Sequence, residues 1–258
     1  MRAIAISLCM TAMMASGGAD AQHTRQEQPN GASDAYEFPL RPGMPEWKDL
    51  KSHAEMLAAC RIPEELLANM STEGLVTTCL NYPMAYDAFA YDSLQQGLKA
   101  IISSFNGLRE LLTRPNAGVL LLRAYQGMDP ANPPDCGYAD KRICRFQIMY
   151  VELLLAEDAI IAGMDTSERR SLLEESHRVV VSKMADGTYG LFSVEPTAFL
   201  MSKILLTEDF EPYRKMAEEN AELKTFVGGE ALRSGDTLKL IVEAVEEFLE
   251  TPLEKDPR

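Results

Sequence analysis

The sequence lacks the short motifs that mark most catalytic and cofactor sites. It contains no GxSxG, HExxH, P-loop or GxGxxG pattern. Its cysteines show no CxxC spacing, and histidine occurs only three times, so the usual ligands of a structural zinc site are missing. The sequence therefore predicts neither a metal nor a cofactor, and an enzyme is less expected than a binding protein.

Positive charge is also scarce. The formal net charge is -14, and an acidic surface repels both nucleic acid phosphates and anionic lipid headgroups. The sequence thus predicts no nucleic acid partner. Beyond the first residues, the longest apolar stretch runs from 146 to 164 and is interrupted by Glu152, Glu157 and Asp158. We expect no transmembrane segment in the mature chain.

The first residues have the layout of a secretory signal peptide. Arg2 gives a positive start, an apolar run extends from Ala3 to Ser16, and residues 19–21 (Ala-Asp-Ala) form a small-x-small cleavage pattern. We therefore expect residues 1–21 to be removed and the protein to be periplasmic or extracellular. The mature chain keeps a net charge of -14, because cleavage removes one positive residue, Arg2, and one negative residue, Asp20.

The cysteines of the expected mature chain are even in number. Four remain, and an even count in an exported protein is typical of disulfides. Four cysteines allow three pairings, and the sequence cannot choose among them with certainty. The pairing that we favour is local, Cys60–Cys79 and Cys136–Cys144, with free structural thiols as the main alternative.

The rest of the chain predicts an all-α fold. We expect a flexible polar leader over 22–35 and a proline-rich extended arm over 36–47, docked on the body. Strand signals are scarce, and helical periodicity with N-caps predicts about ten short-to-medium helices in an irregular α-α array, as one domain over 36–250. Residues 251–258 should be a disordered tail. The expected helices start near Ser52, Pro63 and Ser71, and then span 93–105, 107–114, 116–126, 141–164, 165–184, 195–206, 212–226 and 237–249.

One group of residues could support acid–base chemistry. Glu174 and His177 are three apart on an expected helix and share a face, so they could act together as a general base. Asp186 and Tyr189 follow in DGTYG and could complete a hydrolase-like site. The interpretation that we favour is a solvated helix face followed by an ordinary Asp-Gly turn.

Aromatic residues offer a different site. Trp47 is the only tryptophan, and it could be either a ligand platform or an anchor for the arm, with the anchor favoured. A carbohydrate or peptide binder could use Trp47 with Tyr82, Tyr86, Tyr91 and Tyr189, provided that several of these rings are exposed in one groove.

The block FPLRPGMPEWKDLKSHAEMLAACRIPEELLANMSTEGLVTTCLNYP, residues 38–83, resembles a helical domain of exported Bacteroidota proteins that has no assigned activity. This resemblance implies export and a helical fold, and it brings no catalytic residues. Together these observations predict an exported, non-enzymatic binding or interaction domain with an unidentified protein or glycan partner. A hydrolase-like enzyme or a carbohydrate or peptide binder is the alternative.

Overall fold

The computed structural model describes residues 34–132 and 141–252, with the backbone alone for 141–144, and these ranges hold helices and no strand. The predicted all-α class is confirmed. Ten of the helices have seven or more residues. The first half contains η1 (Glu46–Asp49), α1 (His53–Ala59), α2 (Glu64–Asn69), α3 (Thr72–Leu80), η2 (Ala85–Ala90), α4 (Leu94–Ser104), α5 (Asn106–Leu111) and α6 (Ala117–Gln126). The second half contains α7 (Lys141–Leu155), α8 (Asp158–Ala162), α9 (Thr166–Ala185), α10 (Leu191–Thr207), α11 (Glu211–Glu219), α12 (Ala221–Val227) and α13 (Gly235–Glu250).

Side-chain caps fix several helix starts where the sequence predicts them. The Ser71 hydroxyl accepts a hydrogen bond from the Gly74 amide and starts α3. At α9, the Asp165 carboxylate accepts from the Glu168 amide while the Glu168 carboxylate accepts from the Asp165 amide, which completes the predicted capping box. These bonds satisfy backbone amides that have no partner inside their own helix.

Two helices predicted as continuous are broken. The segment 141–164 divides into α7 and α8, because Glu157 takes an extended backbone with φ -66° and ψ 135°. The break turns α8 toward α6, where Gly118 leaves room for Met164. The segment 212–226 divides into α11 and α12 at Asn220, whose side chain caps the second helix. Neither break carries a proline or glycine.

Helix α10 starts earlier than predicted. We expected it to begin at Glu195, next to Pro196, but it begins at Leu191 and contains Pro196 in its second turn. A proline inside a helix removes one backbone hydrogen bond, and here the surrounding packing tolerates that loss.

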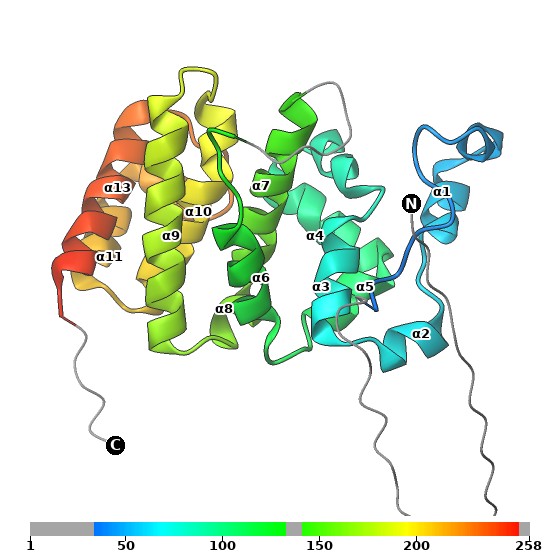
Figure 1. Cartoon of the computed structure of the whole chain (residues 1–258). Helices are drawn as coiled ribbons and strands as arrows, with labels where there is room; N and C mark the ends of the chain where they lie inside the picture. The colour runs from blue at the N-terminus through cyan, green and yellow to red at the C-terminus, as the bar shows by residue number, and fades with distance from the viewer. Residues whose placement is uncertain (1–33, 133–140, 253–258) are drawn as a thin grey trace, which may run out of the picture. The chain divides into compact units, whose positions relative to one another are not determined.

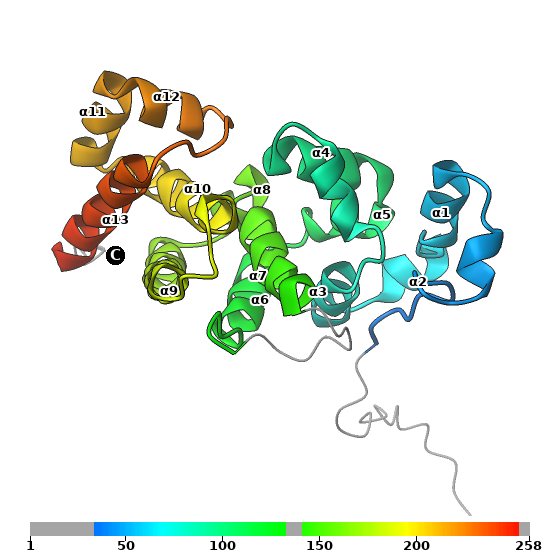
Figure 2. The same ribbon diagram turned by 90° about the horizontal axis from the view of Figure 1, so that it is seen from above.

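Helix α7 is central to the packing, as its apolar sequence predicts. It contacts α3, α4, α6, α8 and α10, and Figure 2 shows it between α4 and α6. Ile148, Val151 and Leu154 are fully buried on it. Helix α9 lies beside α10 and α13 in the same body (Figure 1). One face of α7 therefore looks toward the N-terminal helices and another toward α9 and α10.

The N-terminal arm is anchored earlier than predicted. The Asp34 carboxylate accepts hydrogen bonds from the Ser71 amide and hydroxyl, each at 2.6 Å, so residue 34, which we expected in the flexible leader, is held at the start of α3. Phe38 is buried against Tyr82. The arm is also not extended throughout, because a 3-10 helix starts directly after Pro45.

The predicted signal peptide, most of the leader and residues 253–258 of the predicted tail lie outside the described residues. Within the described ranges, no helix has both the length and the apolarity needed to cross a membrane.

Candidate functional site

Glu174 and His177 do not act as a pair. The Glu174 carboxylate lies 3.5 Å from Arg170 on the same helix. The His177 ring places Nε2 at 3.1 Å from Glu246 of α13. Each residue thus has a separate partner, Arg170 or Glu246, and the candidate Glu–His general base is not formed.

Asp186 and Tyr189 lie elsewhere. Asp186 ends α9, nine residues beyond His177, which corresponds to about 13 Å along a helix. Its carboxylate accepts from the Thr188 amide, and this bond lowers the Asp186 pKa. The Tyr189 hydroxyl donates to the Pro130 carbonyl at 2.8 Å, and the Arg145 guanidinium lies over the ring. The structure therefore does not bring the four predicted catalytic candidates into one site.

Trp47 is partly buried and packs against the core from η1. The anchoring role that the sequence favours fits this position. The described residues contain no group of three or more His, Cys, Asp or Glu side chains that could hold a metal ion.

Cys60 and Cys79 are both buried free thiols in this structure. Burial raises the pKa of Cys60 to about 11 and raises that of Cys79 further. The Cys60–Cys79 disulfide that the sequence favours is not formed in this structure. Both residues are buried thiols, as the alternative of free structural thiols predicts. The Cys136–Cys144 pairing involves Cys136, which lies outside the described residues.

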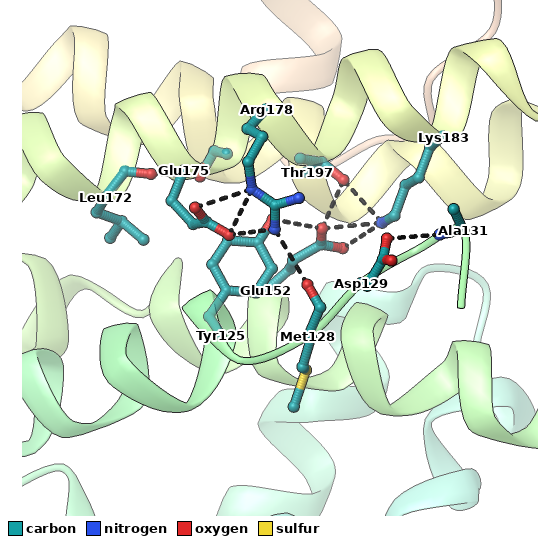
Figure 3. Close-up of polar contacts among 11 residues, drawn as sticks. Tyr125, Met128, Asp129, Ala131, Glu152, Leu172, Glu175, Arg178, Lys183 and Thr197 are labelled. Carbon is teal, nitrogen blue, oxygen red and sulfur yellow. Dashed lines mark hydrogen bonds and ion pairs between the residues drawn. The ribbon is translucent and has the colours of Figure 1, made fainter. Parts of the chain in front are cut away.

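A buried charged network joins four helices (Figure 3). Lys183 of α9 and Glu152 of α7 are both fully inaccessible, and the lysine Nζ lies 2.8 and 2.7 Å from the two carboxylate oxygens. The Tyr125 hydroxyl of α6 and the Thr197 hydroxyl of α10 donate to Glu152 at 2.8 and 2.7 Å. Lys183 also donates to Thr197 and to the Ser193 carbonyl.

This network fits a structural role better than a catalytic one. Burial lowers the pKa of Lys183, while the Glu152 carboxylate acts to raise it. A lysine with a lowered pKa can serve as a nucleophile, but here its donors are taken by protein acceptors and its side chain has no exposed surface. In the sequence, Glu152 only interrupts an apolar run. Its partner Lys183 lies 31 residues away, so the sequence does not indicate the pairing.

A cavity of about 490 Å³ lies on the other side of α7. Its aromatic walls come from Tyr82 and Tyr86, which follow α3, and from Phe146 and Tyr150 of α7. The Tyr86 and Phe146 rings lie 4.3 Å apart between centroids, and the Phe146 and Tyr150 rings 5.8 Å apart. We call this cavity the aromatic pocket. Tyr91, Trp47 and Tyr189 do not line it, so two of the five predicted aromatic residues come together.

The pocket holds a buried polar group without a partner. Tyr150 is 1% exposed, and among the described residues no group forms a hydrogen bond with its hydroxyl. Burial raises the pKa of Tyr150, so the hydroxyl stays neutral and can donate. Leaving such a group unpaired costs about 1–3 kcal/mol. A polar atom of a bound molecule would remove that cost.

Exposed aromatic side chains continue from the mouth of the pocket. Phe89 and Phe192 are 44% and 53% exposed. Phe89 lies 4.9 Å from the Phe146 ring and 5.8 Å from the Phe192 ring, centroid to centroid. Clustered exposed apolar side chains of this kind are typical of binding surfaces.

Comparison with protein-family models, curated proteins and solved structures finds no match to this chain. Export, the resemblance to a Bacteroidota domain, and a protein or glycan partner therefore stay predictions.

Proposed function

We propose that the protein is a binding domain that receives an aromatic or apolar group of its ligand in the aromatic pocket. The observation that carries the proposal is an aromatic cavity lined by Tyr150, whose buried hydroxyl has no partner among the described residues. Small-molecule sites are usually apolar cavities of about 300–1,000 Å³ with a few polar groups. The aromatic pocket, at about 490 Å³, falls in that range.

The setting that we propose is the periplasm or the cell exterior, supported by the N-terminal sequence alone. Mass spectrometry of the protein recovered from its native cells should give a mature chain that begins at Gln22. A mature chain that retains residues 1–21 would contradict export by this signal.

The binding proposal can be tested with 4-ethylphenol, a neutral probe that has one aromatic ring and one hydroxyl. Titration calorimetry should detect binding to the full mature chain. Replacing Tyr86 with alanine removes one wall of the pocket, so we expect about a tenfold weaker affinity, as for loss of a ring that stacks on a ligand.

Tyr91 provides a matched control. It is 49% exposed, against 39% for Tyr86, and does not line the pocket. Tyr91→Ala should therefore leave the affinity unchanged, and circular dichroism melting curves should show that both variants fold. Equal losses in the two variants, or no binding of the probe to the wild-type protein, would refute the proposal.

A further inference from the structure

The lining of the aromatic pocket includes a basic side chain, although the protein is acidic. The chain carries a net charge of -14, yet among the described residues that line the pocket, Arg41 alone is charged. The nearby Asp87 carboxylate of η2 lies 2.7 Å from the His53 ring, and its negative charge acts on Tyr82 in the pocket wall. Among the described lining residues, Arg41 is therefore the charged side chain that a ligand in the pocket meets.

Arg41 is not used elsewhere in the fold. Its side chain is exposed, and it forms no ion pair or hydrogen bond with any described residue. Other arginines differ in this respect: Arg61, for example, is paired with Glu64 at 2.5 Å. A guanidinium beside an aromatic cavity can bind a carboxylate through two parallel hydrogen bonds.

Two further residues that line the same cavity have polar groups without a partner among the described residues. Gln147 lies one residue after Phe146 on α7, and its amide makes no hydrogen bond within the described part of the chain. The Tyr150 hydroxyl is the buried unpaired group described above. Arg41, Gln147 and Tyr150 thus surround an aromatic cavity and leave their hydrogen-bonding capacity for a ligand.

We infer that the ligand is a small aromatic carboxylate. Its ring packs against the wall that the contacting Tyr86 and Phe146 rings form together, its carboxylate binds Arg41, and a polar ring substituent bonds the Tyr150 hydroxyl. This inference rests on the proposed function and adds the charge of the ligand to it.

Three probes with one ring system separate the two proposals. They are 4-ethylphenol, which is neutral, 4-hydroxyphenylacetate, which is an anion, and tyramine, which is a cation. We expect the anion to bind about fivefold more tightly than the neutral probe at low salt, since an exposed ion pair contributes little more than this. Tyramine should bind most weakly, and added salt should reduce the advantage of the anion.

Variants assign the effect to its residue. Arg41→Gln should remove the preference for the anion, so that the variant binds 4-hydroxyphenylacetate and 4-ethylphenol with equal affinity. Lys48→Gln removes an equal charge from the nearby η1, outside the pocket, and it should preserve the preference for the anion.

The outcomes are distinguishable. If all three probes bind equally, the carboxylate inference is wrong and the binding proposal survives. A preference for the anion that persists in Arg41→Gln would also overturn the inference. Failure of every probe to bind would overturn the proposed function and the inference together.

Discussion

Removing the charge of Lys183 should destabilise the protein strongly. In Lys183→Met, the Glu152 carboxylate stays fully buried and loses the ammonium group that lies within 2.8 Å of both its oxygens. The hydroxyls of Tyr125 and Thr197 still donate to it, but neither carries a positive charge. Breaking a buried ion pair from one side costs about 3–5 kcal/mol. For a domain of this size, that corresponds to a decrease in Tm of about 10 °C.

The partner variants show whether the lost charge is the cause. Glu152→Gln should cost less than Lys183→Met, because a buried lysine can lose its proton and its pKa is already lowered by burial. The double variant Glu152→Gln/Lys183→Met leaves no buried charge, and its amide oxygen can still accept from Tyr125 and Thr197. We expect the double variant to be about 2 kcal/mol more stable than Lys183→Met alone.

Urea denaturation at pH 7 measures these free energies of unfolding through a double-mutant cycle. The reasoning would be refuted if Lys183→Met cost less than about 1 kcal/mol, since a buried unpaired carboxylate should cost more. It would also fail if the effects of the two single substitutions simply added in the double variant, because contacting charges must couple.

Three other results follow from individual residues. Burial lowers the pKa of Lys183, so the unfolded chain holds this proton to higher pH than the folded protein, and the contribution of Lys183 to stability should rise as the pH approaches about 10.4. Buried groups with a raised pKa, such as Tyr125 and Cys60, act in the opposite direction, so urea titrations at several pH values should show the rise as an increase in the stability of the wild type relative to Lys183→Met. In Glu152→Gln, compared with the double variant, the rise should begin at lower pH, because Glu152 acts to raise this pKa. A Cβ on Gly74 would lie 1.9 Å from Asp34 Oδ1. Gly74→Ala should therefore lower the free energy of unfolding by about 1 kcal/mol. The loss should disappear in an Asp34→Gly background, because the clashing carboxylate is then absent. Because the pKa of Cys60 is about 11, only about one Cys60 thiol in a thousand is ionised at pH 8. A thiol reagent should therefore label Cys60 at least 100-fold more slowly in the native protein than in urea. If Cys60 were not labelled in urea without reductant, this would instead indicate a disulfide.

The helical class follows from local signals in the sequence. Caps such as Ser71 and Asp165 act within three residues, and apolar periodicity acts within one or two turns, so both can be recognised in the sequence. The break at Asn220 carries a signal of the same kind, because the Asn220 side chain accepts from the Leu223 amide and caps α12. The break at Glu157 carries no side-chain cap, so no local signal of this kind marks it.

The sites depend on longer distances in sequence. The spacing of Glu174 and His177 predicts a common helix face. In the structure each side chain is paired with a different residue, and the partner of His177 lies 69 residues away on α13. The aromatic pocket combines Arg41 of the arm, Tyr86 of η2 and Tyr150 of α7. Phe146 and Tyr150 are four residues apart, which predicts a shared aromatic face on one helix. Only the fold shows that the Tyr86 ring packs against this face.

The most direct test of the account is to locate a bound probe by NMR. In a sample saturated with 4-ethylphenol, intermolecular nuclear Overhauser effects should connect the probe to the ring protons of Phe146 and Tyr150. Contacts confined to residues outside the aromatic pocket, or chemical shifts that stay unchanged at millimolar probe, would contradict the assignment of this cavity as the binding site.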